Sequence, residues 1–274
     1  MATDRSKEFW DIFDSILGEL KAPETTVGLG TLLFLRWSDF QEAESEAIAA
    51  FEGSDYEPAL PSPLHWRSWY ALPGDDLEHV LTVALPDTLR KLNNVRHNRL
   101  ATYLHHLLPG LDILSKLPIE PLSRLVAWLA AQPFETPQDR LRLLHVLDQL
   151  SGEDLGRYSG YYQTPDSVSR LLAALADPQP GQRVYDPCFG QGRLLISAYE
   201  HVTGQQVRRP VAAGETMEVT GGEINPLTYI VGMTRMVLSG IQDPLLELGN
   251  SLERGAREGA ERDGYDVALS DPPF

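Results

Sequence analysis

The chain has 274 residues, enough for one large domain or two of ordinary size, and 42% of them are hydrophobic, so it can bury a core. A single cysteine excludes an internal disulfide and a zinc site built from cysteines. The formal net charge is −16 and neither half is basic, so overall charge does not predict phosphate binding. Because no apolar run reaches the length of a membrane helix and the N-terminus lacks a signal-peptide pattern, we expect a cytoplasmic protein with no membrane partner.

The first 150 residues carry patterns typical of helices. Apolar side chains recur at helical spacing over residues 9–20, and a second apolar run over residues 27–37 continues into an acidic stretch. Residues 52–76 are rich in proline and glycine, which indicates a long loop or a set of short turns. Asp75 or Asp76 is expected to cap a third helix that runs to about Leu92.

Further helices are expected over residues 98–108, 119–132 and 138–150, the last with Thr136 as its cap and Pro137 at its first position. The basic segment at residues 90–99 is typical of a solvated helix end, with a phosphate contact as the alternative. His105 and His106 have no carboxylate or cysteine partner at metal-ligand spacing, so we interpret them as structural and expect no metal site.

The pattern changes after Gly152. Thr164 is expected to cap an amphipathic helix that begins at Pro165 and ends at Ala176. Four apolar runs then alternate with helical patterns, which predicts right-handed crossovers and a parallel sheet whose ligands bind at the carboxyl ends of the strands. The expected strands cover residues 182–185, 217–224, 245–248 and 267–269, and the expected helices cover residues 193–202, 226–238 and roughly 251–262.

Glycine and acidic residues follow the first two expected strands. Gly190 and Gly192 would let a ligand approach the backbone closely, although a tight turn needs the same residues. The loop matches neither of the common phosphate-binding glycine motifs, so phosphate binding is disfavoured. Glu223 could accept hydrogen bonds from the two hydroxyls of a ribose, or could cap the next helix. The joint occurrence of the glycine loop and this acid favours a nucleoside ligand.

Two more polar segments follow the third and fourth strands. Asn250 could bond an adenine edge or serve as an ordinary helix cap. Asp271-Pro272-Pro273-Phe274 must turn away from the sheet, because two prolines cannot continue a strand ladder. This turn would present a carboxylate, a backbone carbonyl and an aromatic ring at one point.

Taken in order, these motifs resemble the N6-adenine DNA methyltransferases of the gamma arrangement, and they are most similar to the modification subunit of type I restriction–modification systems. The segments that carry the resemblance are Tyr-Tyr-Gln-Thr-Pro at 161–165, Asp-Pro-x-x-Gly-x-Gly at 186–192, Gly-Glu-Ile-Asn-Pro at 222–226, Gly-Asn-Ser-Leu at 249–252 and Asp-Pro-Pro-Phe at 271–274. The resemblance covers residues 155–274 well and the helical half of the chain more weakly. The resemblance implies an α/β protein with a helical N-terminal domain over residues 1–152. The first part of a doubly wound, Rossmann-like class I methyltransferase sheet would follow over residues 153–274.

The same resemblance implies S-adenosylmethionine as the cofactor, and DNA together with specificity and restriction subunits as partners. The specificity subunit would supply much of the positive surface that this chain lacks. The implied catalytic motif consists of Asp271, Pro272, Pro273 and Phe274. The carboxylate of Asp271 and the carbonyl of Pro272 would hold the target amino group, and the ring of Phe274 would stack on a base flipped out of the duplex. The implied cofactor-binding residues are Tyr161, Tyr162, Gln163, Thr164, Pro165, Asp166, Asp186, Cys188, Phe189, Gly190, Gln191, Gly192, Glu223, Ile224 and Asn250.

Some positions depart from the family pattern and keep alternatives open. Gln191 stands where the family usually has threonine, and Asn250 where it usually has aspartate. The aspartate form of the last motif is shared with enzymes that methylate cytosine N4, so an amino-methyltransferase acting on cytosine N4 is one alternative. The family continues beyond this motif, so we expect an expressed fragment, with a natural truncation or one part of a split enzyme as alternatives, and no DNA methylation by this chain alone. A catalytically inactive scaffold that binds partner subunits through its helical domain is the alternative from another class.

Overall fold

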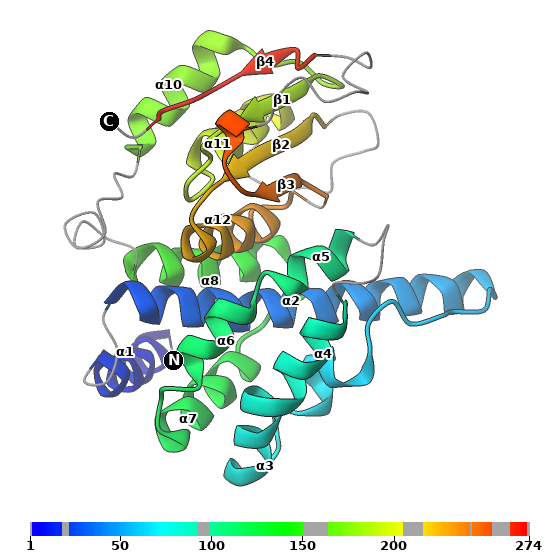
Figure 1. The fold of residues 1–274 in the computed structure, drawn as a ribbon, viewed down its shortest axis with the longest axis vertical. Helices are drawn as coiled ribbons and strands as arrows, with labels where there is room; N and C mark the ends of the chain where they lie inside the picture. The colour runs from blue at the N-terminus through cyan, green and yellow to red at the C-terminus, as the bar shows by residue number, and fades with distance from the viewer. Residues whose placement is uncertain are drawn as a thin grey trace. The chain divides into compact units, whose positions relative to one another are not determined.

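The computed structural model describes residues 2–17, 22–92, 99–150, 164–204, 216–241, 243–253 and 264–272. The chain divides into two compact units, Met1–Glu135 and Thr136–Phe274 (Figure 1). Helix α8 (Pro137–Leu150) belongs to the second unit, where it packs against helix α12 (Pro226–Leu238). The boundary expected between residues 152 and 153 stays a prediction.

The described part of the first unit is helical, as its apolar spacing predicted. The middle of α2 forms the centre of its core, where Leu32, Leu33 and Phe34 are completely buried. From Glu44 onward α2 is mostly exposed, which agrees with the change from apolar to acidic residues along it. The helices of this unit are α1 (Ala2–Leu17), α2 (Ala22–Glu52), α3 (Gly74–His79), α4 (Leu85–Leu92), α5 (Arg99–His105), α6 (Leu108–Leu114) and α7 (Ile119–Ala130).

The proline-rich segment that follows α2 is a loop with two short 3₁₀ helices, η1 (Ser62–Leu64) and η2 (Trp66–Ser68), as predicted. Glu42 of α2 is buried and accepts a hydrogen bond of 2.5 Å from the hydroxyl of Tyr56. Because a buried carboxylate is costly unless it is hydrogen-bonded, this contact fixes the loop on α2.

The predicted helix that ends at Leu92 is confirmed, but its predicted cap is wrong. A π-helical turn, η3 (Val80–Ala84), joins α3 and α4 into one helical run. Pro73 is the N-cap residue and makes no side-chain capping bond, whereas Asp75 and Asp76 lie within the first turn. From this position their negative charges interact favourably with the positive end of the helix dipole.

The helix expected over residues 98–108 exists but ends earlier than predicted. Helix α5 ends at His105, and α6 begins at Leu108 after a short turn. Pro109 lies in the first turn of α6, where proline is tolerated, whereas it would break the interior of a longer helix. This explains why the chain ends one helix and starts another.

The basic segment at residues 90–99 lies mostly outside the described residues. Its first member, Arg90, forms an exposed ion pair of 2.8 Å with Asp87. His105 places Nδ1 3.0 Å from the carbonyl oxygen of Leu89, and burial lowers the pKa of His106 to about 4. Both histidines therefore pack within the helical unit.

The second unit contains the predicted parallel sheet. Its strands are β1 (Arg183–Asp186), β2 (Glu218–Glu223), β3 (Leu245–Leu248) and β4 (Val267–Ala268), within two residues of the predicted bounds. The spatial order is β3–β2–β1–β4, and each described pair is parallel. The chain thus builds outward from β1 to β3 and then returns to the other side of β1. Such a reversal creates a crevice at the carboxyl ends of β1 and β4, where ligands bind in open α/β sheets.

Helices α10 (Asp166–Ala176) and α11 (Arg193–Thr203) pack against each other, and α11 also packs on β1 (Figure 1). Helix α12 packs on β2 and β3. The prediction that Thr164 caps α10 is wrong, because Pro165 is the N-cap residue and no side chain makes a capping bond. Of the helix expected over residues 251–262, the structure describes a 3₁₀ turn, η4 (Ser251–Glu253), and the rest lies outside the described residues.

None of the described helices combines the length and the apolar character needed to cross a bilayer.

The start of α8 has the cap that the sequence predicted, and it can be tested. Thr136 Oγ1 accepts a hydrogen bond from the backbone N–H of Asp139 at 3.2 Å and donates one to its carboxylate at 2.6 Å. We predict that Thr136→Ala lowers the free energy of unfolding by about 1 kcal/mol, as loss of such a cap usually does. Urea unfolding measures the change. Thr136→Ser, which keeps the hydroxyl, should stay close to wild type, and an equal loss in both variants would contradict the role of the hydroxyl.

Candidate active site

Asp186 is the last residue of β1 and lies at the crevice between β1 and β4. It is 1% exposed, and its Oδ1 accepts a hydrogen bond of 3.0 Å from the backbone N–H of Cys188. Burial, opposed by the hydrogen bonds to Cys188 and aided by the nearby carboxylates of Glu223 and Asp271, raises the pKa of Asp186 to about 7. The ionised form of Asp186 is therefore costly in this site, and a positive charge nearby would stabilise that form.

Asp271 follows β4, and the structure joins it to a segment far away in the sequence. The hydroxyl of Thr164 donates a hydrogen bond of 2.8 Å to Asp271 Oδ2, across 107 positions of the chain. Pro272 lies beside it and is exposed. Thr164, which was expected to cap a helix, instead orients the carboxylate of the predicted catalytic motif.

The glycine loop between β1 and α11 has the backbone that its two glycines predicted. Gly190 and Gly192 have φ angles of 56° and 80°, in the left-handed region that favours glycine. The N–H of Gly190 donates a hydrogen bond of 3.0 Å to Glu223 Oε2. The end of β2 therefore holds the loop that follows β1.

Glu223 is 6% exposed, and both of its oxygens accept backbone hydrogen bonds. Besides the bond from Gly190, Oε1 accepts one of 2.8 Å from the N–H of Asn225. The side chain of Asn225 caps α12 by accepting from the N–H groups of Leu227 and Thr228. The alternative in which Glu223 caps the next helix is therefore wrong.

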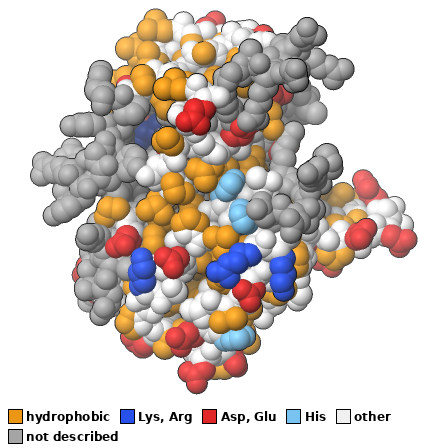
Figure 2. Space-filling view, viewed as in Figure 1, with side chains coloured by type: hydrophobic (Ala, Val, Ile, Leu, Met, Phe, Trp, Pro, Cys, Tyr) orange, Lys and Arg blue, Asp and Glu red, His pale blue; other side chains and the backbone are white. Residues whose placement is uncertain are grey.

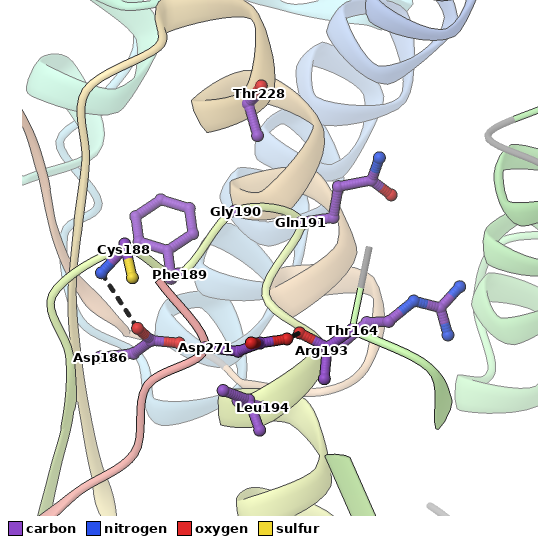
Figure 3. Close-up of a pocket in the computed structure, with 10 residues that line it drawn as sticks. All are labelled: Thr164, Asp186, Cys188, Phe189, Gly190, Gln191, Arg193, Leu194, Thr228 and Asp271. Atoms are coloured by element: carbon purple, nitrogen blue, oxygen red, sulfur yellow. Dashed lines mark hydrogen bonds between the residues drawn. The ribbon is translucent and has the colours of Figure 1, made fainter. Parts of the chain in front are cut away.

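These segments enclose a pocket (Figure 3). The side chains of Asp186, Asp271 and Thr164 lie beside one another in the close-up, below the loop that carries Gly190. The residues that line the pocket are Thr164, Asp186, Cys188, Phe189, Gly190, Gln191, Arg193, Leu194, Thr228 and Asp271. Seven of these were predicted from the sequence: all except Arg193, Leu194 and Thr228.

Other predicted site residues lie elsewhere. Asn250 uses its side chain locally, since Oδ1 accepts from the N–H of Leu252 and Nδ2 donates to Glu253. Ile224 is 65% exposed. Among the described residues, those predicted for the site that do not line the pocket are Pro165, Asp166, Gly192, Glu223, Ile224, Asn250 and Pro272. Tyr161, Tyr162, Gln163, Pro273 and Phe274 lie outside the described residues. The roles of all these residues toward a cofactor stay predictions.

Sequence reasoning missed three pocket residues. Arg193 is the first residue of α11, immediately after the glycine loop, and its guanidinium lies 3.9 Å from the carboxylate of Asp166. Leu194 follows it, and Thr228 lies in the first turn of α12. All three occupy helix starts that follow strands β1 and β2, which was the signal that could have identified them.

Residues 146–274 match the family model described as N-6 DNA methylase. The match covers nearly all of the second unit, and we refer to residues 146–274 as the methylase domain after it. The chain is also homologous to methylase subunits of type I restriction enzymes. It is 27% identical to the EcoEI methylase subunit of Escherichia coli over 256 residues, which are 90% of this chain and 50% of that protein. Over 86 residues, 31% of this chain and 18% of the relative, it is 31% identical to the HindI methylase subunit of Haemophilus influenzae.

Solved structures agree with the fold. A modification subunit of a proposed type I restriction enzyme from Vibrio vulnificus YJ016 matches with a TM-score of 0.71 and 23% identity, over 100% of this chain and 61% of that one. A chain solved in a study of the assembly and conformational transition of the type I system matches with a TM-score of 0.74 and 24% identity, over 98% of this chain and 55% of that one. The chain thus spans about half the length of the EcoEI relative and somewhat more of these structures. The methylase domain has the α/β fold that the strand and helix pattern predicted.

The raised pKa of Asp186 predicts a pH dependence of stability. Its pKa rises from 3.8 to about 7 in the folded chain, so between these values the folded state binds a proton that the unfolded state does not. Stability should therefore fall as the pH rises from about 4 to 7, by an amount on the order of 4 kcal/mol from this group.

Urea unfolding of wild type and Asp186→Asn at several pH values measures this effect, because asparagine has the same shape and no charge. The stability of the variant relative to wild type should increase as the pH rises through this range. A difference between the two proteins that does not change with pH would contradict the buried-proton account.

Proposed function

We propose that the methylase domain binds S-adenosylmethionine in the pocket and belongs to a DNA methyltransferase that methylates adenine N6 within a type I restriction–modification system. The observation that carries the proposal is the hydrogen bond from Thr164 to Asp271 at the mouth of the glycine-loop pocket. It brings the predicted catalytic carboxylate to the place where the predicted cofactor loop lies. Residues of the two predicted motifs line the same pocket, which supports a single site.

The chemistry of the pocket fits this cofactor. S-adenosylmethionine carries a cationic sulfonium and an ammonium group, and the pocket contains the carboxylates of Asp186 and Asp271. Arg193 offers a positive charge for the cofactor carboxylate. The side-chain oxygen of Gln191 is buried and has no hydrogen-bond partner in the described structure, so it can accept a bond from a ligand.

The ribose of the cofactor would bind at Glu223. A carboxylate has about four lone-pair sites, and the two backbone bonds to Gly190 and Asn225 leave room for hydroxyl donors. At the position of a Gly190 side chain, the nearest atom is the carbonyl oxygen of Cys188 at 3.9 Å. The backbone of the loop is therefore open to a ligand at this point.

The bound cofactor would supply an electrophilic methyl group, and the residues of this chain would prepare the nucleophile. The exocyclic amine of adenine is a weak nucleophile because its lone pair is delocalised into the ring. The carboxylate of Asp271 and the carbonyl of Pro272 would accept its two hydrogens, which favours a pyramidal nitrogen with a free lone pair. Thr164 holds Oδ2 of Asp271 in place, so positioning and electrostatics would provide most of the rate.

The surface charge bears on how DNA would be bound. On the face shown in Figure 2, the Lys and Arg side chains of the described residues are mixed with Asp and Glu rather than gathered in one area. With a net charge of −16, long-range attraction to phosphate is absent from the chain as a whole. We therefore assign most of the positive surface of the complex to the specificity subunit.

Cofactor binding can be tested by calorimetry with S-adenosylmethionine. We predict that Glu223→Gln weakens binding at least about tenfold, because one or more charge-assisted hydrogen bonds are lost. Glu218→Gln, at the other end of β2, is the control and should bind as wild type does. Equal affinities in all three proteins would contradict the role of Glu223, and an absence of binding by wild type would favour the scaffold alternative.

The reaction can be tested with a methyl-labelled cofactor, DNA, and the complete methylase subunit with its specificity subunit. Label should appear at adenine N6, and Asp271→Ala should lower the rate by about 100-fold, comparable to the loss of one preorganised hydrogen bond in other active sites. Asp271→Asn keeps an acceptor oxygen and should retain more activity than the alanine variant. Label at cytosine N4 or on protein would contradict the proposed substrate.

A further inference from the structure

The aromatic residue of the glycine loop is held by two other glycines. We propose that the ring of Phe189 anchors the cofactor loop, residues 187–192, and that Gly221 and Gly232 form the slot that admits the ring. This inference rests on the proposed function and identifies Phe189 as a positioning residue for cofactor binding. Figure 3 shows the ring beside the backbone of the loop, apart from the carboxylates of Asp186 and Asp271.

The slot has no space for a side chain on either wall. The ring of Phe189 is 4% exposed. A Cβ atom at Gly221 of β2 would lie 2.7 Å from its Cδ1 atom, and one at Gly232 of α12 would lie 2.8 Å from its Cε2 atom. The Cβ at Gly232 would also lie 2.5 Å from the carbonyl oxygen of Gly190. These distances are far below van der Waals contact, so the ring and the loop fit because both positions are glycine.

Glycine is costly at both positions, which makes a specific reason for it necessary. Gly232 lies in the middle of α12, where alanine would favour the helix, and Gly221 lies within β2, where glycine weakens a strand. Neither residue has the left-handed backbone that would call for glycine. The close approach of Phe189 provides the reason.

The anchor acts on the atoms proposed to surround the cofactor. The backbone N–H of Phe189 donates a hydrogen bond of 3.0 Å to the carbonyl of Gly222, and its carbonyl accepts one of 2.7 Å from Gly192. The neighbouring N–H groups of Cys188 and Gly190 bond Asp186 and Glu223. A displacement of the ring would therefore move every one of these loop contacts, although the ring itself needs no contact with the cofactor.

A double-mutant cycle with Gly221→Ala, Phe189→Leu and the double variant tests the slot, because leucine is smaller than the ring and the atom closest to a Cβ at Gly221 belongs to Phe189. Two quantities are measured: the urea midpoint of unfolding and the affinity for S-adenosylmethionine by calorimetry. We expect Gly221→Ala to weaken binding at least tenfold with phenylalanine at 189, and less than threefold with leucine at 189. The urea midpoint should show coupling of the same sign. Gly264→Ala, where a Cβ would meet no atom within 4 Å, is the control and should change neither quantity.

The outcomes separate this inference from the proposed function. If Gly221→Ala binds the cofactor as tightly as wild type does, or weakens binding equally with either residue at 189, the anchor role is overturned while cofactor binding stands. If wild type binds no cofactor, the proposed function fails and the positioning role fails with it. If Gly221→Ala does not fold but the double variant folds and binds within threefold of Phe189→Leu, the slot is supported.

Discussion

The reversal of strand order at β1 is the constraint on which the candidate site depends. The chain places β2 and β3 on one side of β1 and then returns to place β4 on the other. All four strands are parallel, so the segments that follow β1 and β4 leave the sheet at the same edge. This brings Asp186 and Asp271 to one pocket and lets Thr164 reach the second carboxylate. The same edge holds Glu223, which ties the loop after β1 to the end of β2.

Carboxylates at this edge are arranged in two different ways. Glu223 is buried but receives two backbone hydrogen bonds, which offset the cost of removing its charge from water. Asp186 is buried more deeply, and its pKa rises to about 7, so its charge is less well stabilised. A cation beside Asp186 would lower this cost. The pocket is therefore complementary to a positively charged ligand, such as the sulfonium cofactor we propose.

Features set by local sequence could be predicted, whereas features set by topology could not. The strands and α12 follow from short apolar runs and helical patterns. Thr136 caps α8 as expected, because a cap depends on neighbours in sequence. Thr164 has the same local signature, but a carboxylate 107 positions away takes its hydroxyl.

Competition between local and distant partners for the same side chain, or between segments for one place, also bears on the other predicted residues. The side chain of Asn250 has a capping partner nearby, and the structure uses it in that way. The slot that holds Phe189 depends on residues from β1–α11, β2 and α12 together, so no single segment of the sequence indicates it. Arg193 lines the pocket although it belongs to none of the predicted motifs, because its position depends on where α11 begins.

The central claim is that the pocket binds a cationic cofactor beside Asp186. Calorimetric titration of the chain with S-adenosylmethionine at about pH 6.5, in two buffers of different ionisation enthalpy, tests it most directly. Because Asp186 has a pKa of about 7 before binding, it is mostly protonated under these conditions. We predict saturable binding with release of about half a proton or more, and loss of that release in Asp186→Asn. Absence of saturable binding, or binding with no proton release, would contradict it.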